Sequence, residues 1–320
     1  MTAILTSTVS RIPFSSAAQR YVYKAGVFEL KALPLVLFWS LGVIWGSNFI
    51  YMKWASDYIT TSQIVLLRVF FGFVSVLVYS ACKKELSTSH IRYSIHFIVM
   101  ALIATVIYYY GFAKGASLLP SGIAGALSGA IPIFSFLIAM VFLPEEKPTF
   151  VRAFGIVIGF FGILLIANPF SEDLASTNTA GVIYMAMGSL SVGISFVYAK
   201  KFISPLNIPS SALTTYQLGF ALVILFTFTE TDGIENILQS NHVALGAVIG
   251  LGILGTGLAY VIYYYLIENL GAVTASSVTY IPPIVALAIG SILIGEEIGM
   301  LDYVAVALIF TGVIFVNKKT

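Results

Sequence analysis

Charged side chains are scarce in this 320-residue sequence: they make up 9% of it, whereas hydrophobic residues make up 59%. Soluble globular domains carry about 25% charged residues, so the composition predicts a membrane protein. The single cysteine, Cys82, excludes an internal disulfide and any cysteine-based metal or redox framework. The phosphate-binding motifs GxxxxGKS and GxxxxGKT are absent, and no soluble region is long enough for an ATP-hydrolysing domain, which argues against an ATP-driven pump.

Groups suited to proton transfer or catalysis are also missing from the middle of the apolar segments. The three histidines, His90, His96 and His242, lie at or near segment ends, and no HExxH motif is present. Ser128 and Ser277 have no histidine on the same helix face to act as a base. We therefore expect no catalytic residue, cofactor, metal or dedicated proton relay. An intramembrane enzyme and a channel are nevertheless kept as alternative functions.

Ten apolar segments take up most of the chain, each near the roughly 20 residues that span a bilayer as a helix. Strand-like alternation is absent, so the fold is predicted to be all-α, with no sizeable soluble domain. The predicted spans cover residues 33–53, 62–81, 95–116, 119–142, 150–168, 180–200, 211–229, 243–267, 272–294 and 300–317.

Basic residues are segregated along the chain. With a cytoplasmic N-terminus, all of them except Lys53, Arg68 and Lys114 fall in inside segments or at inner span ends, while the outer loops carry acidic residues. The positive-inside rule therefore predicts cytoplasmic termini, and we expect a plasma (inner) membrane location. Residues 1–32, rich in Ser, Thr and basic residues, are interpreted as a disordered cytoplasmic tail. The alternative is a transit peptide and an organelle membrane.

The sequence repeats itself at an offset of 151 residues. The matched pairs are Thr105 with Thr256, Tyr109 with Tyr260, Leu119 with Leu270, Ala124 with Ala275, Pro132 with Pro283, and Glu145-Glu146 with Glu296-Glu297. An offset of 147 aligns Gly46, Phe49, Tyr51 and Lys53 with Gly193, Phe196, Tyr198 and Lys200. The two units, 33–169 and 170–320, hold five predicted spans each. Five is odd, so the second unit is expected to be inverted, an arrangement typical of secondary transporters with a substrate site near the midplane.

Several motifs together resemble the EamA branch of the drug/metabolite transporter superfamily. They are GVIWGSNFIYMKWA at 42–55, VLLRVFFG at 65–72, SGIAGALSGAIPIF at 121–134, FLPEE at 142–146, SSVTYIPPIVALAIGSILIGEE at 276–297 and ALIFTGVIFV at 307–316. The resemblance covers roughly residues 33 to 317. It implies ten helices in two inverted five-helix repeats, cytoplasmic termini, a central cavity, and alternating access that carries small metabolites, often outward. It does not fix the substrate.

A stripe of hydroxyl-bearing side chains marks the predicted cavity. Thr256, Tyr260 and Tyr263 are spaced i, i+4, i+7 and so share one helix face, and Thr105 and Tyr109 repeat the stripe in the first half. Tyrosines also anchor helices at the membrane interface, which is the alternative role. The neighbouring tyrosines 108, 110, 264 and 265 are expected to point elsewhere around each helix, some of them toward lipid or the interface.

Other polar residues interrupt apolar runs and complete the candidate substrate site. Asn48 must face the bundle, either as a hydrogen-bonded link between helices or as a substrate ligand, because a bare amide in lipid costs several kcal/mol. The remaining candidates are Trp45, Ser128, Ser195, Ser277 and Tyr280. Pro132 and Pro283 are predicted to free backbone carbonyls in mid-membrane. Gln217 is a weaker candidate.

Structural or gating roles are expected for charges in or beside the spans. Lys53 is predicted to snorkel to the headgroups, with a place in the substrate path as the alternative. Arg68 lies too deep for easy snorkelling, so a clasp on helix-end carbonyls is favoured over substrate contact. Glu145 and Glu296 end matching spans, either as interfacial helix ends or as parts of a gate.

The residues that line this cavity suit a small amphipathic or zwitterionic metabolite. Tyrosine and tryptophan faces attract an ammonium group by cation–π contact of about 0.5–2 kcal/mol. Amino acids or related amines are therefore the leading predicted substrates, and the family resemblance favours export. Nucleobases and hydrophobic drugs remain alternatives. The expected partners are a small-molecule substrate and the lipid bilayer, without nucleic acid. The sequence leaves transport direction and oligomeric state open.

Overall fold

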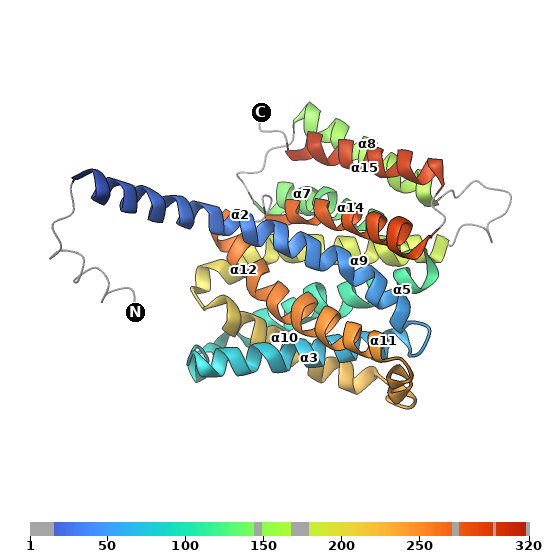
Figure 1. Cartoon of the computed structure of the whole chain (residues 1–320), viewed down its shortest axis with the longest axis horizontal. Coiled ribbons are helices and arrows are strands. Elements are labelled where there is room, and N and C mark those ends of the chain that lie inside the picture. The colour runs from blue at the N-terminus through green and yellow to red at the C-terminus, as the bar shows by residue number, and fades with distance from the viewer. Residues whose placement is uncertain (1–15, 144–148, 168–178, 271–274, 297–298, 318–320) are drawn as a thin grey trace. The chain divides into compact units, whose positions relative to one another are not determined.

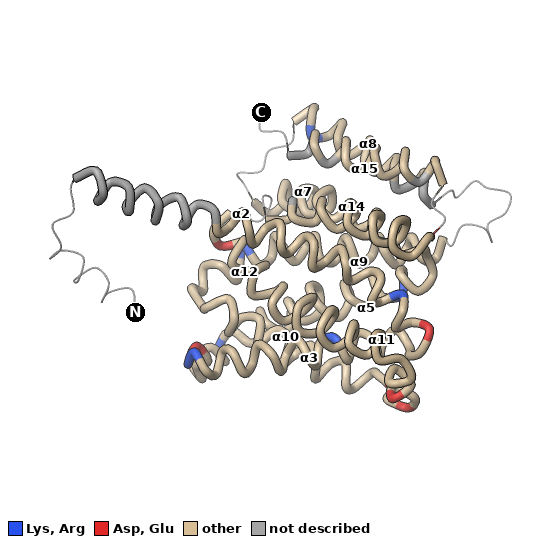
Figure 2. Tube along the Cα trace, viewed as in Figure 1, with Lys and Arg blue, Asp and Glu red and all other residues tan. Residues whose placement is uncertain are grey.

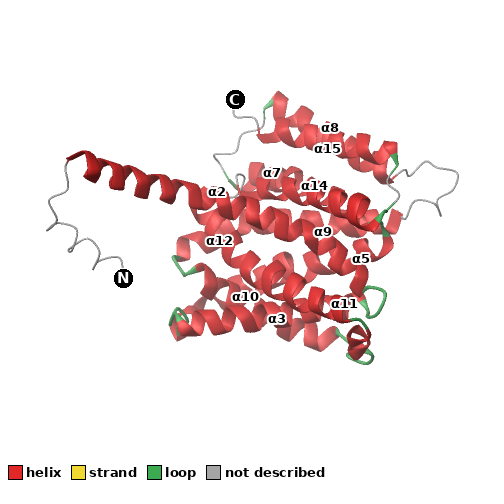
Figure 3. Cartoon of the chain, viewed as in Figure 1, coloured by secondary structure: helices red, strands yellow, loops and turns green. Residues whose placement is uncertain are grey.

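The computed structural model describes residues 16–143, 149–167, 179–270, 275–296 and 299–317, and every regular element within these ranges is a helix (Figure 3). The α-helices are α2 (Ser16–Ala55), α3 (Thr61–Cys82), α4 (Ser94–Ala101), α5 (Ile107–Leu118), α6 (Ser121–Leu127), α7 (Ile131–Phe142), α8 (Phe150–Ala167), α9 (Thr179–Tyr198), α10 (Ser210–Phe228), α11 (Asn241–Leu245), α12 (Ala259–Leu270), α14 (Ile281–Ala288) and α15 (Met300–Asn317). The all-α prediction is confirmed for this part of the chain.

The chain divides into two units, residues 1–37 and residues 38–320. Helix α2 begins at Ser16, in a region that the sequence led us to expect as an irregular tail. A helical backbone therefore precedes Pro34, which the sequence pattern placed near the start of the first span. The second unit contains all the candidate site residues, and the description below concerns it alone.

Among the described residues, seven helical segments are long and apolar enough to cross a bilayer, so the chain is a multi-pass membrane protein. They are Leu33–Ala55, Thr61–Cys82, Thr88–Leu118, Ser121–Phe142, Thr179–Leu206, Ser210–Phe228 and Asn241–Leu270. Each of them corresponds to one predicted span, and most of their ends lie within a few residues of the predicted ends. Within the described residues, the predicted fifth, ninth and tenth spans correspond to the shorter apolar helices Phe150–Gly162, Val278–Ile294 and Tyr303–Gly312. The count of ten membrane crossings stays a prediction.

Charged residues lie mainly at helix ends and turns, with long uncharged stretches between them (Figure 2). One such end is fixed by a reciprocal cap: Gln63 donates its backbone N–H to the Thr60 hydroxyl, and the Thr60 N–H donates to the Gln63 side-chain oxygen. This capping box satisfies two of the N–H groups that would otherwise be bare at the start of α3. The Gln63 amide also donates to the carbonyls of Glu230 and Asp232, which ties α3 to the 229–241 loop.

Small residues set the closest helix contacts. Helices α8 and α15 pack side by side (Figure 1), and a Cβ on Gly312 would lie 2.4 Å from the carbonyl oxygen of Gly155. Helices α5 and α9 meet in the same way, since a Cβ on Gly111 would lie 2.7 Å from the Tyr184 carbonyl. Small residues at such crossings let two backbones approach closely in a membrane.

Matching turns precede the prolines of both halves. A 3₁₀ turn, η4 (Ser128–Ala130), leads into Pro132, and a second, η9 (Ser277–Tyr280), leads into Pro282 and Pro283. The Ile131 N–H donates to the Ser128 carbonyl, and the Ile281 N–H donates to the Val278 carbonyl. The prediction that Pro132 frees a carbonyl is therefore wrong for Ser128, because the tighter turn supplies the hydrogen bond that proline cannot. The same correction applies to the Val278 carbonyl, which lies four residues before Pro282, whereas the freed carbonyl expected from Pro283 stays a prediction.

Candidate functional site

Repeat-related side chains from both halves meet in the interior of the second unit. Tyr109 on α5 and Tyr260 on α12 have ring centroids 6.0 Å apart, and both side chains are fully buried. Thr105 and Thr256 lie in π-helical segments, η3 (Leu102–Val106) and η8 (Gly246–Leu258), which run directly into α5 and α12. The stripes that the sequence predicted for one face of each helix thus come together.

Arg68 is the charged group of this interior, and its side chain is 2% exposed. Its Nε donates to the Thr256 hydroxyl at 3.2 Å, and its Nη2 donates to the Gly255 carbonyl at 3.4 Å. The third contact is Nη1 to the Met52 sulfur at 3.6 Å, and the guanidinium carbon lies 3.5 Å from the centre of the Tyr109 ring. No carboxylate among the described residues pairs with it.

These contacts tie three helices together around one charge. Met52 belongs to α2, Gly255 and Thr256 to η8, and Tyr109 to α5. All four of these groups are neutral, and one is a thioether sulfur, which accepts weakly. Arg68 therefore does link helices, and no carboxylate among the described residues compensates its positive charge.

The tyrosines continue the cluster toward α9. Tyr263 shares a hydrogen bond of 3.1 Å with the Ser195 hydroxyl, and its ring is 5.5 Å from that of Tyr260. The Tyr260 hydroxyl donates to the Ala104 carbonyl. Trp45 lies against this end, with its ring centroid 6.4 Å from that of Tyr263. A wall of aromatic faces with hydroxyls at its edge can hold the apolar and cationic parts of a small solute.

Two polar atoms in the same interior have no hydrogen-bond partner among the described residues. They are the Trp45 indole N–H and the Asn48 side-chain oxygen, on residues that are each 4% exposed. A buried polar group without a partner costs about 1–3 kcal/mol. Asn48 also lies close to Gly255, because a Cβ built on that glycine would be 2.4 Å from the Asn48 oxygen. The described protein groups therefore leave the hydrogen-bonding capacity of this donor and this acceptor unused.

A second hydrogen-bond chain was largely missed from the sequence. The Gln217 amide donates to the Thr105 hydroxyl at 2.8 Å, and the Tyr264 hydroxyl donates to the Gln217 side-chain oxygen. Tyr264 and Tyr108 are buried, 4% and 5% exposed, so they are not among the flanking tyrosines that face lipid or the interface. Tyr110, at 36%, does reach the outside. The signal was the single amide of Gln217 within an apolar run.

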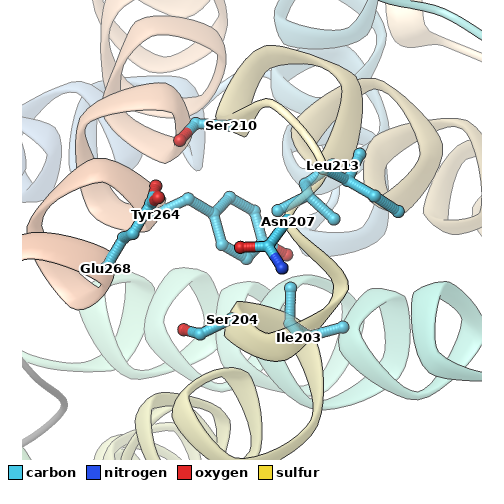
Figure 4. A pocket seen from close by; sticks show the side chains of 8 residues that line it. Ile203, Ser204, Asn207, Ser210, Leu213, Tyr264 and Glu268 are labelled. Carbon is cyan, nitrogen blue, oxygen red and sulfur yellow. The ribbon is translucent and has the colours of Figure 1, made fainter.

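Tyr264, the last member of this hydrogen-bond chain, also lines a small pocket at the end of α12 (Figure 4). Its walls come from α12, through Tyr264 and Glu268, and from the segment that joins η6 (Ser204–Leu206) to α10. Figure 4 shows Glu268, Asn207 and Ser210 among the residues that line it. Glu268 is exposed, so this pocket joins the buried chain to the outside of the unit.

The remaining predicted side chains have local partners. Ser128 donates to the Gly125 carbonyl at 2.6 Å within its own helical segment, and Tyr280 is half-buried. The Ser277 side chain and Glu145 lie outside the described residues. The structure thus gathers Trp45, Asn48, Arg68, Thr105, Tyr109, Ser195, Thr256, Tyr260 and Tyr263 through the contacts given above.

Two further predicted residues, Lys53 and Glu296, form hydrogen bonds with the turn between α5 and α6. The Lys53 ammonium donates to the carbonyls of Ser117 and Leu119, at 3.3 and 3.2 Å, which close the C-terminal end of α5. Glu296 accepts from the Ser121 N–H at 2.8 Å, the Ser121 hydroxyl at 2.7 Å and the Gly122 N–H at 3.0 Å, all at the start of α6. Lys53 thus reaches a helix end, and its snorkelling to the headgroups stays a prediction.

Comparisons with known proteins agree with this architecture. The sequence profile of the EamA-like transporter family matches residues 32–168 and again residues 179–318. An uncharacterized transporter of Archaeoglobus fulgidus is 23% identical over 86% of this chain and 95% of its own length. The uncharacterized transporter YoaV of Bacillus subtilis is 25% identical over 88% and 95%, respectively. One crystal structure superposes with a TM-score of 0.61 at 15% identity, over 89% of this chain and 97% of the other.

Proposed function

Since this chain belongs to the EamA-like transporter family, we propose that it exports a small zwitterionic metabolite, foremost an amino acid or a related amine. The observation that carries the proposal is the unfilled hydrogen-bonding capacity of Trp45 and Asn48 beside a wall of buried tyrosines. The aromatic faces attract an ammonium group, and the Asn48 oxygen accepts its N–H groups. Nucleobases and hydrophobic drugs are the alternative substrates.

Transport proceeds by alternating access in this proposal, through ten helices in two inverted repeats with cytoplasmic termini in the inner membrane. Two profile matches and the meeting of Tyr109 with Tyr260 support the repeat. The relative YedA of Escherichia coli, 28% identical over 62% of this chain, is named as an inner membrane transporter. Hydrogen bonds of Lys53 and Glu296 close the α5–α6 turn, which is one end of the proposed pathway.

Counterflow in proteoliposomes tests this function. Vesicles are preloaded with unlabelled amino acids, amines or nucleobases, and uptake of the labelled counterpart is followed. We expect accumulation with an amino acid that is reduced at least 10-fold in Asn48→Ala and Tyr260→Phe, because each removes a polar atom of the interior. Tyr110→Phe is the matched control, since Tyr110 neighbours Tyr109 but is exposed. Folded protein that gives no counterflow with any compound would contradict the proposal.

A further inference from the structure

We propose that Arg68 binds the carboxylate of the substrate, so that the transporter selects amino acids over the corresponding amines and amides. This inference rests on the proposed function and narrows its substrate class. Arg68 then has two tasks: it links α3 to η8 through Thr256 and Gly255, and it presents an unneutralised charge to the solute.

Arg68 carries a positive charge that no carboxylate among the described residues compensates. A buried cation normally pairs with an anion, because neutral groups recover only part of the hydration that it loses. Arg68 is 2% exposed and has a thioether, a hydroxyl, a carbonyl and a ring face around it, with no carboxylate among the described residues. A substrate carboxylate would supply the missing charge.

Unused hydrogen bonds are the second step. A guanidinium has five N–H donors. Three have acceptors among the described residues, at 3.2, 3.4 and 3.6 Å, and the longest goes to sulfur. Good charge-assisted N–H···O bonds are about 2.7–2.9 Å long. The present contacts are therefore weak enough to be exchanged for a carboxylate, whose two oxygens match the fork of a guanidinium.

The side-chain oxygen of Asn48, an acceptor near Arg68, indicates the class of ligand. Gly255 gives its carbonyl to Arg68, and its Cα faces the Asn48 amide, whose oxygen has no partner in the described part of the chain. Both residues thus adjoin one glycine, as the carboxylate and ammonium of an α-amino acid adjoin one carbon. The Trp45 and Tyr263 rings continue from there and would accommodate a side chain.

Paired probes test this assignment in the wild-type protein. Phenylalanine is compared with phenylalaninamide and phenethylamine, and alanine with alaninamide, by competition against counterflow of the labelled amino acid. A charge-assisted contact predicts that each amino acid competes about 10- to 100-fold better than its partner. Equal competition by acid and amide would overturn the proposal, and this arm requires no variant.

Variants then assign the preference to Arg68. In Arg68→Gln, the ratio of the apparent affinities for acid and amide should fall close to 1, while Arg68→Lys, which keeps the charge, should retain part of it. A residue that only links helices would lower both affinities together and leave the ratio unchanged. An unchanged ratio in folded Arg68→Gln would therefore contradict the assignment. If Arg68→Gln does not fold, Arg68→Lys decides, because loss of the bidentate fork alone should lower the ratio.

Thermal unfolding of the detergent-solubilised protein separates failure of the two proposals. Benzoate and benzamide differ only in the charged group, so benzoate should raise the melting temperature of wild type more than benzamide does, and this difference should be smaller in Arg68→Lys. If benzoate raises the melting temperature more than benzamide does but no counterflow is found, the amino-acid transport proposal is overturned and anion binding at Arg68 is supported. Equal shifts with the two probes would overturn the Arg68 assignment, whatever the counterflow shows.

Discussion

At the α5–α6 turn each charged side chain meets a helix end of opposite sign, whereas in the interior Arg68 meets only neutral groups. Glu296 accepts three hydrogen bonds at the start of α6, where the helix dipole is positive. Lys53 donates to two carbonyls at the end of α5, where it is negative. Arg68 has a ring face, a sulfur and two long hydrogen bonds.

The difference separates a charge that holds the fold from a charge available to a ligand. At the turn, a ligand would have to compete with the 2.7–3.0 Å bonds of Glu296 and with two Lys53 bonds of 3.3 and 3.2 Å, each made to a helix end of opposite sign. Beside Arg68, a ligand would add charge compensation that the protein does not provide. The depth of a charge in the membrane therefore says less about its role than the chemistry of its partners does.

Removal of Glu296 should give the largest effect on folding. Glu296→Ala leaves the Ser121 and Gly122 N–H groups at the start of α6 without an acceptor, and we expect a loss of about 3 kcal/mol in the free energy of unfolding. Denaturant titration of the protein in detergent measures this. Glu235→Ala, at an exposed carboxylate, is the matched control and should change stability by less than about 0.5 kcal/mol. Equal losses in the two variants would contradict a structural role for the turn.

A methyl group on Gly255 tests how tightly the interior is closed. In Gly255→Ala the new carbon would lie 2.4 Å from the Asn48 oxygen and 2.6 Å from the Gly250 carbonyl, so Asn48 must move away. We expect a stability loss of about 2 kcal/mol and a higher KM for the transported amino acid. Gly219→Ala is the control, because its nearest neighbour is the Phe73 ring at 3.2 Å. If Gly255→Ala is as stable as this control, the interior is looser than described.

Lys53 gives the direct contrast with Arg68. Lys53→Met removes the donor to the Ser117 and Leu119 carbonyls and should lower stability by about 1 kcal/mol, since those carbonyls are half-buried at a helix end. It should leave the preference for acid over amide unchanged, the opposite of Arg68→Gln. Competition assays on both variants measure this. A Lys53→Met protein with altered preference would break the distinction between the two cations.

Span positions and the hydroxyl stripes were predictable because they depend on local spacing. Apolar length located the long helices, and the spacing of Tyr260 and Tyr263 predicted that they lie together, with ring centroids 5.5 Å apart. Thr256 itself lies in the π-helical segment η8, whose periodicity differs from the i, i+4 spacing of an α-helix. The burial of Tyr264 depends on Gln217 of another helix, so the pattern of α12 alone does not contain it.

The partners of charges were not predictable for a related reason. Lys53 reaches carbonyls 64 and 66 positions away, and Glu296 reaches N–H groups 174 and 175 positions away. No local pattern in the sequence encodes such contacts. The sequence did identify Lys53, Arg68 and Glu296 as candidates, because charge is rare in this chain, but it did not distinguish a helix cap from an open binding group.

Trp45 should give the smallest effect on stability and still a measurable one on transport. Trp45→Phe keeps an aromatic ring near Tyr263 but removes the indole N–H, which has no acceptor among the described residues. Because no protein hydrogen bond is lost, the stability change should stay within about 1 kcal/mol. A neutral hydrogen bond to the substrate contributes about 0.5–1.5 kcal/mol, so KM should rise roughly 3- to 10-fold. Unchanged KM in counterflow would place Trp45 outside the substrate site and confine binding to the side of Arg68 and Asn48.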